Sequence, residues 1–329
     1  MKKVLSILLA LMMVLLCFGC DSAAQNDDPK LPLGGSDKDT FTVGICQLTT
    51  HVALDAATKG FKDVLTEEFG DKVTFIEGDG AGETSTCSTI VNDFVSKNVD
   101  LIMANATGAL QAAANATLDI PILGTSVTEY GVALEIENFS GTVGGNISGT
   151  SDLAPLTEQA QMIVDLCPNA KKVGLLYCSA EANSEYQVKV IEDELGKKNI
   201  ETKRFSFADS NDVAQVTEAA ADWSDAIYVP TDNKAADCTA TINSVTLPKK
   251  VPIIAGEEGI CSGCGIATLS ISYENLGRKT GEMAVKILKG ESDISKMPIE
   301  YDTNPVKKYN KSICTELGIT PPEGYVAIE

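Results

Sequence analysis

The chain has 329 residues, 44% of them hydrophobic, which suits an ordinary globular protein large enough for two full domain cores. It carries 46 acidic residues against 26 basic ones, for a formal net charge of -20. Such a charge repels phosphate backbones and anionic lipid surfaces, so nucleic acid is not an expected partner. Because His51 is the only histidine, a metal site built from several imidazoles is excluded as well.

The first twenty residues have the order of an export signal, with two lysines, an apolar run and then Gly19 immediately before Cys20. This order is similar to that of bacterial lipoprotein signals, in which cleavage leaves Cys20 as a lipid-modified N-terminus. A signal cut at another position and an uncleaved anchor helix are the alternatives. Residues 21–40 are polar and acidic, which predicts a flexible tether. We therefore expect an extracytoplasmic protein, lipid-anchored to the outer face of the bacterial cell membrane.

From Phe41 onward, short apolar runs alternate with segments of helical period. In the first half, the pattern predicts strands at 41–46, 72–77, 100–104 and 121–126, and helices at 52–69, 84–97 and 107–117. The Gly-rich segment at 139–150 is expected to be an extended crossing between domains rather than part of a domain core.

The alternation then restarts. The second half predicts helices at 152–166, 181–197, 210–221 and 233–246, with strands at 172–177, 200–207, 225–229 and 251–255. A strongly amphipathic helix at 273–289 and a strand at 298–303 follow. Strands that alternate with helices predict parallel sheets covered on both faces.

The two halves repeat one another. Three short motifs recur in the same order, about 130 residues apart: residues 43–45 match 173–175, residues 100–102 match 225–227, and residues 121–123 match 252–254. The repeat predicts an α/β protein of two similar lobes, each a doubly wound parallel sheet. Ligands bind beyond the carboxyl ends of such strands, so two facing rims predict a cleft between the lobes.

Polar residues gather at these strand ends and are the expected ligand contacts. They are Gln47, His51, Asn105, Thr107, Thr125 and Ser126 in the first half, and Ser179, Glu181, Asn183, Thr231, Asp232 and Glu257 in the second.

Each of these residues also has a purely structural interpretation. His51 stands at a helix start, where it is either a cap or a ligand contact. At the start of the helix at 181–197, the backbone amides near Ala182 and Asn183 are expected to receive a ligand carboxylate, with simple capping by Ser179 as the alternative. Asp232 is either an N-cap or, like Glu257, a partner of a ligand ammonium, since buried carboxylates call for a cation.

Aromatic contacts to the ligand are expected from Tyr130, Tyr177 and Tyr186, for which packing in the core is the alternative.

No catalytic machinery is visible in the sequence. The glycine loop at 78–87 lacks the G-x-G-x-x-G order of dinucleotide sites, and there is no Walker motif and no G-x-S-x-G elbow. Cys261 and Cys264 have the spacing of a redox pair, yet no second pair completes a zinc site. The cysteines fall mostly inside apolar segments, so we expect mostly free thiols, no metal and no cofactor.

Several longer stretches carry a family resemblance. VGICQLTTHVALDAATKGF, GTSVT, GLLYCSAEANSEYQ, YVPTDN and SYENLGRKTGEMAVKILKG are similar to ABC-transporter substrate-binding proteins of the tryptophan/tyrosine type, and the resemblance spans residues 42–322. It implies a type I periplasmic-binding fold, in which two α/β lobes joined by hinge strands close around a small ligand. By that pattern, residues 41–150 with 272–296 form the N-terminal lobe, and residues 151–271 with 297–329 form the C-terminal lobe. The sequence departs from the family pattern at residues 105–108 and 128–130, near the expected cleft.

The resemblance and the residues together predict a solute-binding lipoprotein of an ABC importer, without enzymatic activity. It is expected to capture a small zwitterion, an aromatic amino acid such as tryptophan, tyrosine or phenylalanine, and to deliver it to the permease subunits as a monomer. Two alternatives remain open at this point. One is an exported thiol-disulfide enzyme that uses Cys261 and Cys264, and the other is a ligand-sensing lobe of a signalling system.

Overall fold

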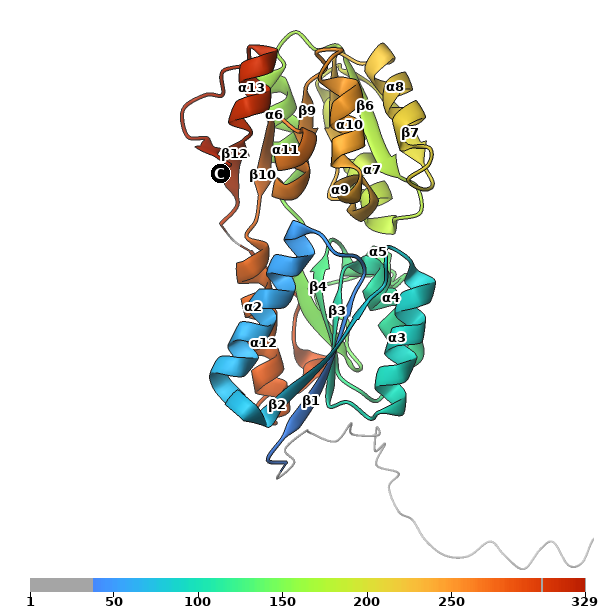
Figure 1. Ribbon diagram of the computed structural model, residues 1–329, viewed down its shortest axis with the longest axis vertical. Coiled ribbons are helices and arrows are strands. Elements are labelled where there is room, and N and C mark those ends of the chain that lie inside the picture. The colour runs from blue at the N-terminus through green and yellow to red at the C-terminus, as the bar shows by residue number, and fades with distance from the viewer. Residues whose placement is uncertain (1–37, 303, 329) are drawn as a thin grey trace, which may run out of the picture. The chain divides into compact units, whose positions relative to one another are not determined.

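The computed structural model describes residues 38–302 and 304–328 (Figure 1). The expected signal peptide, the lipid attachment at Cys20 and all but the last residues of the tether lie outside the described part of the chain. Within that part, no helix combines the length and apolarity that a membrane span requires.

The first sheet has six parallel strands in the order β11-β5-β4-β3-β1-β2. Its strands are β1 (Phe41–Gln47), β2 (Val73–Asp79), β3 (Leu101–Asn105), β4 (Ile122–Val127), β5 (Ile147–Ser151) and β11 (Glu300–Tyr301). Its helices are α2 (Val52–Phe69), α3 (Thr84–Ser96), α4 (Thr107–Ala116), α5 (Tyr130–Ala133) and α12 (Tyr273–Leu288), with short 3-10 turns η1 (Gly70–Lys72) and η2 (Ile294–Lys296).

Helices cover both faces of this sheet, as the buried strands require. Along β1, Val43 and Ile45 pack with residues of α2 and α12, whereas Cys46 faces the core formed with α3 and α4. Figure 1 shows α2 and α12 side by side, with α3 and α4 on the opposite face. The alternation follows from the two-residue period of a strand.

The second sheet has seven strands in the order β13-β12-β10-β9-β8-β6-β7 and is parallel except where β12 runs antiparallel to β10. Its strands are β6 (Lys172–Cys178), β7 (Glu201–Phe207), β8 (Ala226–Val229), β9 (Ile253–Ala255), β10 (Ala267–Ser270), β12 (Val306–Tyr309) and β13 (Val326–Ala327). Its helices are α6 (Leu156–Leu166), α7 (Ala182–Lys197), α8 (Val213–Trp223), α9 (Asn233–Asp237), α10 (Thr239–Thr246), α11 (Glu258–Cys264) and α13 (Lys311–Leu317).

The expected elements are present, with bounds that differ by a few residues, but three expectations need correction. Residues 147–151, expected in a crossing, form the buried strand β5 of the first sheet. A Cβ at Gly149 would lie 2.1 Å from the carbonyl oxygen of Gly124, so the glycines of this segment permit close packing of β4 and β5. The single helix expected at 233–246 is divided in two at Cys238, whose backbone leaves the helical conformation.

The third correction concerns the strand expected at 298–303. It is shortened to β11, which pairs with β5 in the first sheet, and the chain enters the second sheet only at β12. The chain thus passes between the two sheets three times, after β5, after β10 and after β11.

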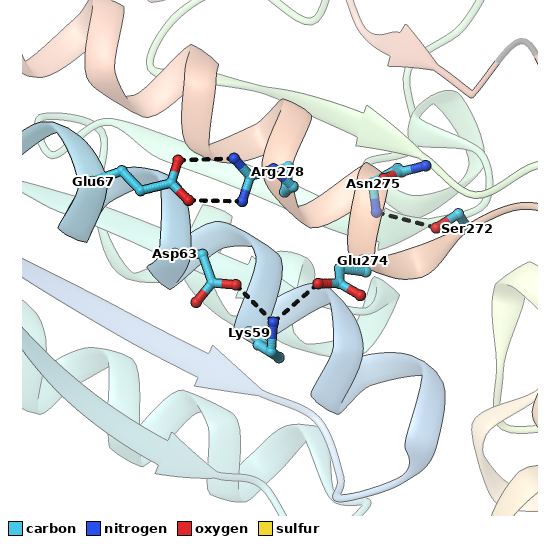
Figure 2. Close-up of polar contacts among 7 residues, drawn as sticks. All are labelled: Lys59, Asp63, Glu67, Ser272, Glu274, Asn275 and Arg278. Carbon is cyan, nitrogen blue, oxygen red and sulfur yellow. Dashed lines mark hydrogen bonds and ion pairs between the residues drawn. The ribbon is translucent and has the colours of Figure 1, made fainter.

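Two glycines allow α12 to pack against α2. A Cβ at Gly277 would lie 1.9 Å from the carbonyl oxygen of Ala57, and one at Gly60 would lie 2.2 Å from that of Glu274. The helices therefore meet backbone to backbone. Ion pairs on the solvent side, drawn in Figure 2, join Lys59 to Glu274 at 3.0 Å and Arg278 to Glu67 at 2.8 Å. These pairs are exposed, so they contribute little to stability.

Candidate functional site

Two neighbouring cavities lie at the carboxyl ends of the parallel strands, where the sequence places its polar residues. The narrow pocket, about 10 Å³ in volume, is lined by His51, Leu54, Ser126, Thr128, Asp152, Asn183, Thr231, Asp232, Asn233, Ala236, Glu257 and Tyr273. The wide cavity, about 310 Å³, is lined by residues 48–49, 82–85, 107–108, 111, 178, 180–183, 208–209, 233–234 and 237. Asn183 and Asn233 line both, and each cavity draws residues from both sheets.

A surface groove of about 660 Å³ between α2 and β2 is larger than either cavity. It is bordered by Lys59 and Lys62, which already pair with Asp63 and Glu77 respectively. Its lining comes from the first sheet and its helices alone, and its two remaining acids, Asp55 and Asp79, accept hydrogen bonds from Gln47 and Thr50. The groove therefore lacks the unsatisfied groups that mark the narrow pocket.

Asp152 is the exceptional residue of the narrow pocket. Its side chain is 4% exposed, and its Oδ2 accepts a hydrogen bond from the Tyr273 hydroxyl at 2.9 Å. Its Oδ1 is buried and has no partner among the described residues. Burial raises the pKa of Asp152, and the Tyr273 hydroxyl, the Thr128 side chain, the backbone amide of Asp152 and the charge of the nearby His51 counteract this only in part. A buried carboxylate oxygen without a donor calls for a donor from outside the chain.

Ser126 supplies a second unsatisfied group in the same pocket. Its side chain is 5% exposed, and no described residue bonds to its Oγ. Its backbone φ is +53°, a left-handed conformation that a residue with a side chain adopts only at a cost. The strained backbone and the free hydroxyl together indicate a functional position.

The other two acids of the narrow pocket are helix caps. Asp232 accepts hydrogen bonds from the backbone amides of Cys178 at 2.6 Å and Ala235 at 2.7 Å, and from the Ser184 hydroxyl at 2.8 Å. Burial, assisted by the nearby charge of Glu181, raises the pKa of Asp232 to about 7. The N-cap bond from Ala235 thus occupies Oδ1 of Asp232, and Cys178 and Ser184 occupy Oδ2.

Glu257 plays the same part at the start of α11. Its carboxylate accepts from the amides of Gly259, at 2.6 Å, and Ile260. Burial raises the pKa of Glu257 as well. Both acids thus line the pocket, but their oxygens are already occupied.

The residues before α7 serve the second sheet rather than their own helix. Glu181 accepts from the amides of Asn233 at 3.1 Å and Lys234 at 2.9 Å, so its carboxylate caps α9. Ser179 donates to the carbonyl of Phe207 at 3.3 Å, and capping of α7 by Ser179 is therefore wrong. No side chain caps the first amides of α7, which border the wide cavity through Ala182 and Asn183.

The remaining predicted residues of the first half divide between the scaffold and the wide cavity. Gln47 bonds Asp55 at 2.7 Å, Asn105 bonds the carbonyl of Leu54 at 2.9 Å, and Thr125 contacts the Thr150 hydroxyl at 3.2 Å. These three residues fasten strand ends and do not line either cavity. Thr107 lines the wide cavity.

Three polar contacts join α9 to loops of the first sheet. The Nε2 atom of His51 lies 3.2 Å from Asn233 Oδ1, and the Thr49 hydroxyl donates to Asp237 Oδ2 at 3.2 Å. The Nζ atom of Lys234 lies 3.9 Å from Glu83 Oε1. His51 therefore stands at the narrow pocket, as its position after a strand end indicates, and makes a contact between the two halves of the chain.

Sequence reasoning missed Asp152 and Tyr273, which lie where the chain passes between the sheets. No usable signal for Asp152 was present in the sequence, because the strand before it, β5, has only one large apolar residue. For the three aromatic candidates, the structure favours the alternative of packing in the core. Tyr130 donates to the carbonyl of Thr150 and Tyr177 to Glu185, and neither they nor Tyr186 line the two cavities.

The cysteines of the described residues are not arranged as a redox centre. All eight cysteines of the described residues are free, and Cys261 and Cys264 are buried in α11. Burial raises the pKa of both thiols, which opposes the thiolate that disulfide exchange requires. Among the described residues, no cluster of His, Cys, Asp and Glu suits a metal ion.

Comparison with known proteins identifies relatives of the whole folded chain. The family model described as ABC transporter substrate binding protein matches residues 42–327. A tyrosine-binding protein of Clostridioides difficile (strain R20291) is 36% identical over 302 residues, which cover 88% of this chain and 85% of the relative.

Two solved structures are similar to the fold. An ABC domain from Streptococcus pneumoniae in complex with L-Trp matches with a TM-score of 0.83 at 32% identity, covering 88% of this chain and all of that one. The ligand-free, open structure of a substrate-binding protein with adhesive properties from Clostridium difficile matches with a TM-score of 0.68 at 34% identity, covering 88% and 99%.

These relatives have the type I periplasmic-binding fold, and the two parallel-dominated sheets described above share it. Their family consists of extracytoplasmic substrate-binding proteins rather than enzymes. The family model spans nearly the whole described chain, so this protein belongs to the ABC transporter substrate-binding proteins.

Proposed function

We propose that this protein captures an amino acid, with the ligand ammonium in the narrow pocket and the body of the ligand in the wide cavity. The observation that carries the proposal is the pair of unsatisfied atoms, Asp152 Oδ1 and Ser126 Oγ, that line one buried pocket. An ammonium has three donors and a positive charge, so it can satisfy both atoms at once.

The charges of the narrow pocket favour a cation. Asp152, Asp232 and Glu257 are buried there, and the only basic side chain among the lining residues is His51. Burying carboxylates without a counter-charge is costly, which is why burial raises the pKa of all three. A ligand ammonium would lower that cost.

The sizes of the two cavities suit a ligand with a small head and a larger body. A volume of about 10 Å³ is roughly that of one water, which an ammonium group can replace. The wide cavity, at about 310 Å³, lies at the lower end of the range for small-molecule sites. Because Asn183 and Asn233 line both, one ligand can extend from the first into the second.

The choice of an aromatic amino acid rests on the relatives. One is a tyrosine-binding protein and another was solved with L-Trp, at 36% and 32% identity. We propose that the ligand here is of the same class, tyrosine or tryptophan foremost.

Capture is proposed to proceed by closure of the two lobes. The first lobe comprises residues 41–150 and 272–296, together with the two residues of β11. The second lobe comprises residues 151–271 and the rest of the C-terminal segment. The three contacts of α9 with the first-sheet loops would form on closure. The higher TM-score with the L-Trp complex than with the open structure supports a closed arrangement here. Ligand that contacts both lobes shifts the population toward that form.

Outside the cell membrane, the protein is proposed to be anchored by lipid at Cys20, to act as a monomer and to deliver its ligand to the permease subunits of an importer. Metabolic labelling with radioactive palmitate tests the anchor, because Cys20→Ser should abolish incorporation. Incorporation that persists in this variant would contradict the attachment site.

A thermal-shift screen tests ligand capture, followed by titration calorimetry on the amino acids that stabilise the chain. We expect stabilisation by tyrosine or tryptophan, with a dissociation constant in the micromolar range, which corresponds to a free energy of binding of about -8 kcal/mol. Stabilisation confined to sugars or nucleosides would contradict the ligand class. Stabilisation by an amino acid that lacks a free ammonium, such as N-acetyltyrosine, would contradict the role of the narrow pocket.

A further inference from the structure

The wide cavity contains a buried hydroxyl without a partner. Thr107 stands in the first turn of α4, its side chain is 4% exposed, and no described residue bonds to its Oγ1. Buried hydroxyls are almost always paired, so an unpaired one that lines a cavity indicates a group missing from the chain itself.

Gln111 lies one turn further along the same helix and lines the same cavity. Residues four apart share a helix face, so Thr107 and Gln111 are neighbours on the side of α4 that borders the cavity. The Nε2 atom of Gln111 donates to the carbonyl of Ala133 at 3.0 Å. Its Oε1 is therefore the atom left to accept, and together the two side chains offer two acceptor oxygens.

The charges of the wide cavity also favour a donor on the ligand. Its lining includes four acids, Glu83, Glu181, Asp209 and Asp237, against the single cation Lys234. Of these acids, Glu181 caps α9 and Asp237 accepts from Thr49. Such a surround attracts the positive end of an O–H or N–H dipole.

We infer that Thr107, supported by Gln111, binds the polar hydrogen of the ligand's ring and thereby selects tyrosine or tryptophan over phenylalanine. This inference rests on the proposed function, since it requires the ammonium in the narrow pocket and the ring in the wide cavity. The phenol O–H and the indole N–H can each donate to Thr107 Oγ1. Phenylalanine has no such donor and leaves the hydroxyl unpaired, as it is without ligand, so it forgoes the buried hydrogen bond that tyrosine or tryptophan gains.

Titration calorimetry with tyrosine and phenylalanine tests the inference on the intact mature chain. The native protein should bind tyrosine about 10- to 100-fold more tightly than phenylalanine, the range expected when a buried polar group is left without its partner. Thr107→Val keeps the shape of the side chain and removes the hydroxyl, and it should reduce the preference to less than about threefold. Thr107→Ser keeps the hydroxyl and should keep the preference.

Thr217→Val is the matched control. Thr217 lies in α8, is fully buried and also has an unpartnered Oγ1, but it lines neither cavity. This variant should retain the native preference for tyrosine. Since removal of an unpaired hydroxyl relieves a cost, Thr107→Val should also melt at or above the native temperature without ligand. Thr107→Ala provides a second hydroxyl-free variant, for which the same loss of preference is expected.

Different failures point to different errors. If Thr107→Val weakens tyrosine and phenylalanine equally, the hydroxyl binds a group common to both, such as the carboxylate, and the inference is overturned. It is overturned as well if the native protein binds the two amino acids equally, or if both hydroxyl-free variants keep the full preference. In each of these cases the proposed function still stands. It would be overturned, together with the inference, if the native protein bound none of tyrosine, tryptophan and phenylalanine.

Discussion

The substitution Asp152→Asn isolates the charge that we assign to the ligand ammonium. Asparagine has nearly the shape of aspartate, and its Oδ1 can still accept the hydrogen bond that Tyr273 donates at 2.9 Å. The unpartnered oxygen becomes either an amide donor or a neutral acceptor. The fold should therefore be preserved, while the binding of an ammonium should be weakened.

The magnitude follows from the burial of the site. A hydrogen bond to a charged group contributes about 1.5–3 kcal/mol, and Asp152 is only 4% exposed, so little of this is lost to solvent. We expect the affinity for tyrosine to fall by about 10- to 150-fold. The ligand-free protein should be no less stable than the native chain, because a buried carboxylate without a counter-charge is itself unfavourable.

Titration calorimetry with tyrosine and with its deaminated analogue, 3-(4-hydroxyphenyl)propionate, separates this charge effect from a general disturbance. The variant should lose affinity for tyrosine but bind the analogue no more weakly than the native chain does. Asp232→Asn is the contrasting variant from the same pocket, and it should destabilise the fold more and affect affinity less, since Asp232 caps α9. An unchanged affinity of Asp152→Asn for tyrosine, with the fold intact, would refute the reasoning.

Three further predictions concern closure, protonation and packing. Thr49→Val removes the hydrogen bond to Asp237 and should weaken ligand binding by about 2- to 12-fold through faster dissociation. Stopped-flow measures the dissociation rate. An unchanged rate would contradict the proposal that the contacts of α9 hold the two lobes closed. Burial raises the pKa of Asp152 and Glu257, and that of Asp232 to about 7, whereas carboxyls of the unfolded chain titrate near pH 4. Over about pH 4 to 7 these groups hold more protons in the folded ligand-free protein than in the unfolded chain, so their contribution to the free energy of unfolding falls as the pH rises. A bound ammonium favours the ionised carboxylates, so tyrosine should bind more tightly at the higher pH. The rise in melting temperature caused by tyrosine should therefore be larger near pH 7.5 than near pH 5.5. An equal or opposite trend would count against binding of the ammonium by these carboxyl groups. Gly277→Ala places a Cβ 1.9 Å from the carbonyl oxygen of Ala57 and should lower the free energy of unfolding, measured in urea, by about 1–3 kcal/mol. Gly196→Ala is the control in α7, where a Cβ would meet nothing within 4 Å, and it should raise the free energy of unfolding by about 0.5–1 kcal/mol. Equal effects of the two substitutions would contradict the packing of α2 on α12.

Most of the fold could be predicted because its signals are local. The strands of parallel sheets are buried on both faces, so runs such as Leu101–Asn105 stand out from the amphipathic helices between them. The strand β5 was harder to predict. Its sequence, Ile147–Ser151, has one large apolar residue, and its burial depends on contacts with Gly124 and on the hydroxyl of Thr150.

The site could be predicted only in outline, because a polar residue at a strand end can point to the ligand or back into the protein. His51 and Ser126 line the narrow pocket, as expected of residues after strands. Asp232 and Glu257 lie there too, but their oxygens are used by backbone amides, a distinction that depends on helix starts several residues away. Asp152 could not be assigned from sequence, since it follows the strand that was not expected.

A crystal structure of the mature protein with bound tyrosine tests the central claim most directly. We predict that the ligand nitrogen lies within hydrogen-bonding distance, about 2.7–3.2 Å, of both Asp152 Oδ1 and Ser126 Oγ, with the ring in the wide cavity. A ligand whose ammonium contacts neither atom, or that binds outside the two cavities, would contradict the account.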